Sequence, residues 1–191
     1  MTGDARVPML DEAAAREAAG RAGVADPLAA LNVFRLLLRR ERLAKGVSDL
    51  LLSLLFGAKL DPRIRELIIM RVAWVTGSVY EWTQHWRIAT DLGIPTDDVV
   101  AVRGGEEDYS GLGELERAAL AAVDECLAGR RISDQVMATL RHHLTDDAVV
   151  ELVAAIGAWS MVSMLLRSLD VPLEDGVGEW PPDNTEAHDL R

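Results

Sequence analysis

Nine consecutive positions, residues 67–75, are apolar except for Arg71. Asp61 and Pro62 precede them, a typical helix start because aspartate can cap the first turn and proline suits the first helical position. Gly77 follows and is a typical helix end. A helix over 61–76 with so little polar surface cannot lie on the outside of a fold. We therefore expect it to be the central, nearly buried helix.

The remainder of the chain is also predicted to be helical. No stretch shows the sustained alternation of apolar and polar residues that marks a strand. The expected fold is therefore all-α, with a marginal polar helix at 11–22 and a Gly-rich acidic surface loop at 104–113. Further helices are expected at 28–45, 47–56, 78–92, 96–103, 115–127, 133–143 and 145–169.

The length of 191 residues, 49% of them apolar, suits one domain with an aliphatic core. We expect an N-terminal extension at 1–26 and a domain at 27–172. Residues 173–191 are rich in Gly, Pro, Asp and Glu, which is typical of an arm or a disordered tail.

Charge and cysteine content exclude several classes of partner. The net charge of −11 disfavours a nucleic acid. The apolar run at 50–56 is too short to cross a bilayer, and no cationic, apolar leader is visible, so we expect no membrane partner. Cys126 is the sole cysteine, which rules out an internal disulfide, a Cys-based zinc site and a CxxC pair. The cytoplasm is the expected compartment.

Candidate catalytic residues lie around Gly77. Ser78, Glu81 and His85 are three and seven residues apart, so they share one face of the helix at 78–92. Glu66 lies on the preceding helix, and a tight hairpin could bring it to the same pocket. Three ionisable groups in an apolar setting favour shifted pKa values and proton transfer, with Glu81 near enough to His85 to share a proton. The alternative is ordinary ion pairing, of Glu66 with Arg63 or Arg71 and of Glu81 with Arg65 or Arg87.

Glu81 and His85 also resemble half of a carboxylate metal site, with Glu66 as a third ligand. A di-metal centre in a helical bundle needs a second Glu/His helix, and the sequence offers none. We therefore expect no metal and no cofactor. The remaining lining is expected from aromatic and small polar residues, which we predict to bind substrate: Ser78, Tyr80, Trp82 and Trp159.

Three segments carry a family resemblance: Asn-Val-Phe-Arg at 32–35, Leu-Asp-Pro-Arg-Ile-Arg-Glu-Leu at 60–67, and Thr-Gly-Ser-Val-Tyr-Glu-Trp-Thr-Gln-His at 76–85. Over about residues 27–175 the chain resembles the carboxymuconolactone decarboxylase and AhpD-like superfamily, in a YEWxxH subgroup lacking the CxxC pair. The resemblance implies a helical bundle built round a central hairpin. It also implies a homo-oligomer, as a dimer, trimer or hexamer.

In the peroxidase branch of that superfamily a Glu relays protons to a Cys-x-x-Cys-x-x-x-His motif. The matching positions here are Glu66, Ser78, Glu81 and His85, so both thiols are absent. Thiol peroxidase activity is therefore disfavoured. Where related chains carry a Tyr-Asn pair and an Arg, this chain has Trp159, Ser160 and Met164.

The sequence thus predicts a cofactor-independent, decarboxylase-like lyase or isomerase. Its substrate would be a small cyclic or unsaturated carbonyl or carboxylate compound, with Glu81 and His85 shuttling the proton and Glu66 tuning them. The alternative is a non-catalytic protein of the same fold that binds a small apolar ligand or serves in assembly. A metal-dependent enzyme is the weaker third reading.

Overall fold

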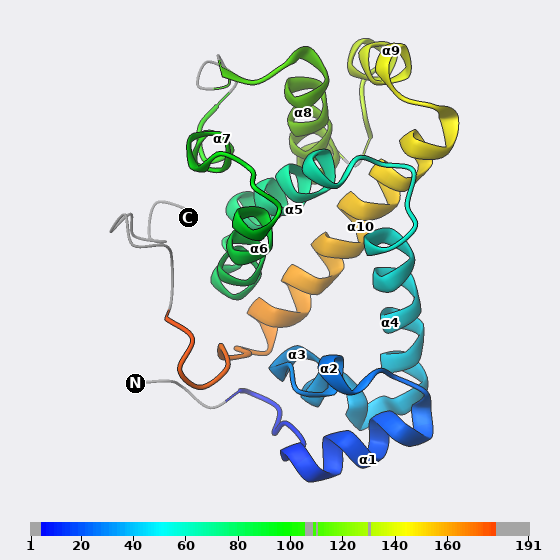
Figure 1. The fold of residues 1–191 in the computed structure, drawn as a ribbon, viewed down its shortest axis with the longest axis vertical. Coiled ribbons are helices and arrows are strands. Elements are labelled where there is room, and N and C mark those ends of the chain that lie inside the picture. The colour runs from blue at the N-terminus through cyan, green and yellow to red at the C-terminus, as the bar shows by residue number, and fades with distance from the viewer. Residues whose placement is uncertain (1–4, 106–108, 110, 130, 179–191) are drawn as a thin grey trace.

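The computed structural model describes residues 5–105, 109, 111–129 and 131–178 (Figure 1). Over these residues the chain forms helices and no strand, which confirms the expected all-α fold. The elements are α1 (Glu12–Ala22), α2 (Asp26–Ala29), α3 (Asn32–Leu37), the 3-10 helix η1 (Leu38–Arg40), α4 (Glu41–Leu55), α5 (Pro62–Thr76), α6 (Val79–Asp91), α7 (Thr96–Ala101), α8 (Glu114–Gly129), α9 (Asp134–His143) and α10 (Asp146–Ser168).

Helix α5 is the centre of the fold, as its composition predicts. Every residue from 64 to 74 is buried, and α5 packs against α6, α8 and α10. The Asp61 side chain accepts a hydrogen bond from the Arg63 backbone N–H at 2.8 Å, which caps the first turn. At the other end Gly77 adopts a left-handed φ of 69°, a conformation that costs glycine little.

The turn at Gly77 folds α6 back along α5. The backbone N–H of Ser78 donates to the Ala73 carbonyl at 2.8 Å, which closes the last turn of α5. Helix α6 starts at the next residue, so the two helices form the expected central hairpin (Figure 1). Glu66 on α5 and His85 on α6 are brought side by side in this way.

The helices expected at 28–45 and 47–56 do not have those bounds. The chain instead forms α2, α3 and η1, and α4 then runs unbroken through Val47 to Leu55. Leu36, Leu37 and Leu38 are all buried just before the break. At Arg40 the backbone leaves the helical conformation, with φ −130° and ψ 81°.

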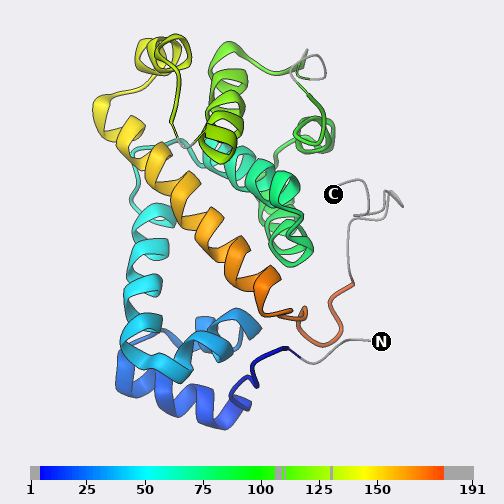
Figure 2. The same ribbon diagram turned by 180° about the vertical axis from the view of Figure 1, so that it is seen from behind.

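Helix α10 crosses the whole molecule, from α9 to the N-terminal helices (Figure 1), and no ribbon covers it in the view from behind (Figure 2). It packs on α5, α4 and α8. By length and composition alone α10 could span a membrane, which the sequence argument from residues 50–56 overlooked. Leu152, Ile156 and Trp159 are buried against the rest of the fold, as in a core helix.

Both ends of the described chain pack on the helical body. Helix α1 buries Ala15, Ala18 and Ala19, so it is less marginal than its polar sequence suggests. Glu174 accepts a hydrogen bond from the Asn32 backbone N–H at 2.9 Å, which holds the segment after α10 against α3. The boundaries at 26 and 172 stay predictions, and residues 179–191 of the expected arm lie outside the described residues.

The segment at 104–113 also differs from the expected surface loop. Tyr109 and Leu112 are 1% and 3% exposed and join the core around α5 and α6. The expected helices after it, including their Ser133 and Thr145 caps, are present.

Candidate active site

A buried chain of hydrogen bonds joins α5, α6 and α10 through His85. Its Nδ1 lies 2.7 Å from Oε2 of Glu66, and its Nε2 accepts a hydrogen bond from the Trp159 indole N–H at 3.0 Å. Since the indole can only donate, Nε2 is an acceptor and the ring proton of a neutral His85 lies on Nδ1, facing Glu66. Both ring nitrogens are therefore engaged.

Glu66 is the ionised member of this chain. It is fully buried, and its Oε1 accepts a hydrogen bond from Arg65 Nε at 3.0 Å. Burial by itself raises the pKa of Glu66, but the hydrogen bond from His85, together with the charge and the hydrogen bond of Arg65, outweighs it and lowers that pKa. Glu66 thus pairs with Arg65 and His85, and not with Arg63 or Arg71 as the ion-pair alternative supposed.

Glu81 has the opposite character. It is 2% exposed, its Oε2 accepts a hydrogen bond from the Ser163 hydroxyl at 2.6 Å, and its Oε1 has no partner among the described residues. Burial raises the pKa of Glu81 well above its ordinary value, and the bond from Ser163 offsets this only in part. The fold therefore favours the protonated form of Glu81, which is bonded to Ser163 and not to His85 or an arginine.

The pairing of α6 with α10 follows one register. Glu81 and His85 are four residues apart on α6, and their partners Ser163 and Trp159 are four residues apart on α10. The sequence analysis singled out Trp159, Ser160 and Met164 on this helix and missed Ser163. The sequence did carry a signal for Ser163. It lies four residues after Trp159, the same spacing that separates Glu81 from His85.

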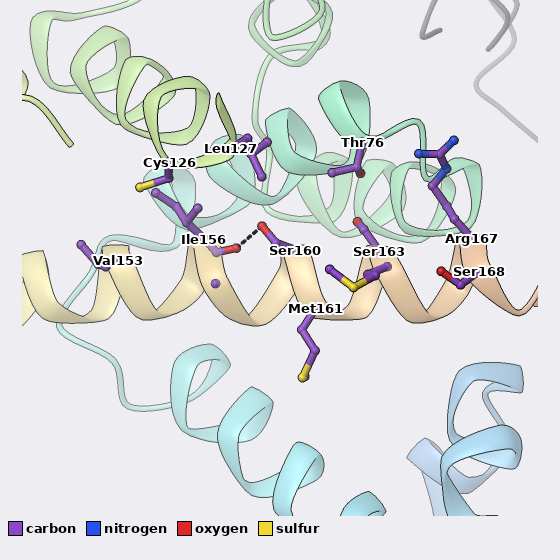
Figure 3. Close-up of a pocket in the computed structure, with 12 residues that line it drawn as sticks. Thr76, Cys126, Leu127, Val153, Ile156, Ser160, Met161, Ser163, Arg167 and Ser168 are labelled. Atoms are coloured by element: carbon purple, nitrogen blue, oxygen red, sulfur yellow. Dashed lines mark hydrogen bonds between the residues drawn. The ribbon is translucent and has the colours of Figure 1, made fainter. Parts of the chain in front are cut away.

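A groove of about 630 Å³ runs along α10 beside these residues. Figure 3 shows Ser160, Ser163 and Arg167 pointing from α10 toward the end of α5, where Thr76 lies. The floor is largely apolar, with Ile156, Met161 and Met164. Ser163 thus lines the groove and also reaches the buried carboxyl of Glu81.

Ser78 lies at the N-cap of α6, next to its first turn. Its hydroxyl is buried and has no partner among the described residues, and it lines a second cavity of about 420 Å³. Tyr80 also lines that cavity, while its hydroxyl donates to Glu174. Burial and the Glu174 charge raise the pKa of Tyr80.

Trp82 lies in a tryptophan cluster of the core. Its ring centroid is 5.3 Å from that of Trp74 and 5.9 Å from that of Trp86, and the Arg103 guanidinium lies 5.0 Å from its ring centre. These contacts match the core reading of the cluster. The predicted contact of Trp82 with substrate stays a prediction.

Metal and thiol chemistry find little support in the described part of the chain. There, no three His, Cys, Asp or Glu side chains gather in the manner of metal ligands. Cys126 lines the groove along α10, and burial, followed by the charge of Glu125, raises the pKa of its thiol. A raised pKa disfavours the thiolate that peroxide reduction needs.

Comparison with known proteins agrees with this architecture. Residues 41–125 match the model of the Carboxymuconolactone decarboxylase family. No curated protein sequence matches the chain. An uncharacterized peroxidase-related protein with an AhpD core, from Ralstonia eutropha, superposes with a TM-score of 0.72 at 18% identity, over 91% of this chain and 94% of its own.

Two further solved structures share the fold. A protein of unknown function from Agrobacterium tumefaciens is 23% identical, with a TM-score of 0.63 over 68% of this chain and 89% of its own. The debrominase Bmp8, solved with 2,3,4-tribromopyrrole, is 18% identical, with a TM-score of 0.64 over 75% of this chain and 76% of its own. The family match over residues 41–125 and the common AhpD-like fold support the predicted resemblance to the carboxymuconolactone decarboxylase and AhpD-like superfamily.

Proposed function

We propose that the protein is a cofactor-independent lyase or isomerase that moves a proton on a small cyclic or unsaturated carbonyl or carboxylate compound. The observation that carries the proposal is the pair of buried carboxyls, Glu66 and Glu81, whose pKa values are displaced in opposite directions. Such a pair is typical of a site that holds an acid and an anion side by side at one pH.

Glu81 is the proposed acid. Decarboxylation or double-bond migration produces a carbanion or enolate that must be protonated. Oε2 of Glu81 lies 2.6 Å from the Ser163 hydroxyl, and Ser163 lines the groove. In the proposed step Ser163 turns its hydroxyl hydrogen to a substrate in the groove and donates it there, while its oxygen accepts the acidic proton from Oε2 of Glu81. The resulting buried carboxylate is a strong base that recovers a proton in the return step.

His85 and Glu66 have a supporting part in this proposal. Because Trp159 covers Nε2 of His85, the imidazole cannot take a substrate proton without displacing the indole. Its bond with Glu66 favours the ionised form of that carboxyl, while burial favours the protonated form of Glu81. The predicted proton shuttle thus centres on Glu81, with the His85–Glu66 pair positioning and tuning it.

Relatives support the coarser class of a small-molecule-processing enzyme. The matched family is named for a lactone decarboxylase, and Bmp8 of the same fold is a debrominase solved with a small cyclic compound. The cytoplasm stays the predicted compartment.

The test is turnover of a panel of lactones and unsaturated acids in deuterated water by the wild type and Glu81→Gln. General acid catalysis contributes about a hundred- to ten-thousand-fold, so Glu81→Gln should lose that much turnover and deuterium incorporation while melting no lower than the wild type. Glu17→Gln, an exposed change on α1, is the matched control and should behave like the wild type. Equal turnover by Glu81→Gln would remove the proposal.

A non-catalytic binding protein is the second candidate. The largely apolar floor of the groove favours it, as does the engagement of both nitrogens of His85. Saturable binding of an apolar lactone by the wild type, with no turnover across the panel, would establish this role instead.

A further inference from the structure

The second cavity lies at the first turn of α6, on the side of Ser78. It is lined by Gly77, Ser78, Val79 and Tyr80, by the end of α10 and by Arg6. No part of the proton-transfer chain just described accounts for its polar groups. Its chemistry is therefore a separate question.

The first turn of α6 offers donors to this cavity. An α-helix leaves its first N–H groups without intrahelical partners, and the Ser78 side chain does not cap them. The Ser78 hydroxyl is 1% exposed and likewise has no partner among the described residues. A helix N-terminus carries a partial positive charge, so these N–H groups and the hydroxyl together favour an anion.

The charged side chains around the cavity add to this preference. Arg167 lines both the cavity and the neighbouring groove, and in Figure 3 its side chain extends from α10 toward α5. Arg6 and Asp170 also line the cavity, but they neutralise each other through an ion pair at 2.5 Å. One positive charge, that of Arg167, is left over in a protein whose net charge is −11.

We propose that this cavity binds a carboxylate group of the substrate. The carboxylate would accept hydrogen bonds from the Ser78 hydroxyl and the N–H groups of Val79 and Tyr80, with Arg167 as its counter-ion. This assignment rests on the proposed function, since it names the end of the substrate that is held.

The position relative to Glu81 fits that assignment. Ser78 and Glu81 are three residues apart, so they share a face of α6. Arg167 and Ser163 are four residues apart on α10 and line the groove together. A carboxylate anchored at Ser78 and Arg167 therefore leaves the reacting carbon of a small unsaturated acid near Ser163 and Glu81.

The experiment is calorimetric titration of the full chain with fumarate and with its neutral diamide. Fumarate should bind with a dissociation constant of about 1 mM or lower, and the diamide should not bind. Arg167→Gln should weaken fumarate binding about tenfold or more. Ser78→Ala should weaken it about three- to tenfold at unchanged melting temperature, because the hydroxyl caps nothing. Arg87→Gln, exposed on α6, is the control and should bind like the wild type.

Three results would overturn the carboxylate site: no fumarate binding by the wild type, wild-type affinity in both Arg167→Gln and Ser78→Ala, or equal binding of the diamide. Calorimetry measures fumarate binding without any need for turnover. The carboxylate-site proposal and the proton-transfer proposal can therefore be contradicted independently of each other. Glu81→Gln should bind fumarate normally. Normal binding together with undiminished turnover in Glu81→Gln would remove the proton-transfer proposal and leave the carboxylate site standing.

Discussion

At the scale of single residues, Glu81 is an acid that the fold keeps neutral. Its one hydrogen bond, from Ser163, leaves Oε1 without a partner in the described chain. Ionising such a group would leave a nearly uncompensated charge out of water. Glu66, one helix away, can be ionised because Arg65 and His85 both donate to it. The same residue type therefore has two charge states within one site.

Glu81 should make the protein less stable as the pH rises. Its folded pKa lies above the ordinary value of 4.5, so the folded state binds the proton more tightly than the unfolded state. The free energy of unfolding should therefore fall from about pH 4.5 upward, until the pH passes the raised folded pKa. Urea unfolding at intervals between about pH 4.5 and about pH 8.5 measures this fall in the free energy of unfolding.

Glu81→Gln isolates the effect, because glutamine copies the neutral acid and does not titrate. The variant should match the stability of the wild type near pH 4.5 and exceed it at pH 8. Each kcal/mol of difference in the free energy of unfolding should raise the melting temperature of the variant by about 2–4 °C. Groups other than Glu81 titrate equally in both proteins and cancel in the difference. Two parallel stability curves would mean that Glu81 is ionised in the folded protein.

The site was predictable where one hairpin determines it. Glu66, Glu81 and His85 follow from the helix start at Asp61 and the turn at Gly77, and the structure does bury all three. Their bonding partners were not predictable. Ser163 and Trp159 lie about eighty residues further on, and which face of α10 meets α6 depends on how the whole bundle packs.

At the scale of elements, α5 owes its position to Arg71 as well as to its apolar residues. The Arg71 guanidinium donates to the Val102 and Gly104 carbonyls, both at 2.7 Å, and forms a two-point ion pair with Asp124 at 2.8 and 3.0 Å. This one side chain connects α5 to α8 and to the segment after α7.

Arg71→Met should therefore destabilise the protein while keeping the packing of the side-chain stem. Two carbonyls and Asp124 lose their donor, which should lower the free energy of unfolding by about 2–3 kcal/mol. This is at the low end for breaking a buried ion pair, because the Asp124 side chain is 39% exposed. Calorimetry should show a melting temperature lower by about 5–10 °C. Arg87→Met, exposed on α6, should change it little, and an unchanged value in Arg71→Met would show that these bonds add no net stability.

Elements with local start and stop signals were predictable, and others were not. Ser133 and Thr145 accept hydrogen bonds from the first turns of α9 and α10, so both starts follow from the sequence. The break at Arg40 carries neither glycine nor proline. The leucines before it, Leu36, Leu37 and Leu38, are all buried, and a local sequence pattern does not contain the tertiary contacts that bury them.

At the scale of the whole molecule, α10 carries an uncovered apolar stripe. Val150, Val153 and Met164 are 68%, 41% and 66% exposed. With Gly157 and Ser160 they repeat at alternating steps of three and four residues, the spacing of a seam between packed helices. The central helix offers no such surface over residues 64–74, which are buried within the protomer. The structural reason to expect the homo-oligomer that the family resemblance implies is therefore the stripe on α10.

We predict that two copies pair through this stripe, within a dimer or a larger assembly. Small residues at its centre allow close approach, and a monomer would leave the stripe in water. Light scattering after size exclusion at micromolar concentration should return a multiple of 20.8 kDa. The double change Val153→Glu and Met164→Glu should shift the mass toward the monomer, because like charges would then meet across the seam.

Ala13→Glu, exposed on α1, adds charge away from the stripe and should leave the mass unchanged. A wild-type monomer would remove the prediction, and an intact assembly in the double variant would place the interface on another face. The pairing also bears on the site, because Val153, Met164 and Ser163 all line the groove. A second copy on α10 would therefore cover that groove, so the face that forms the seam would also close the site.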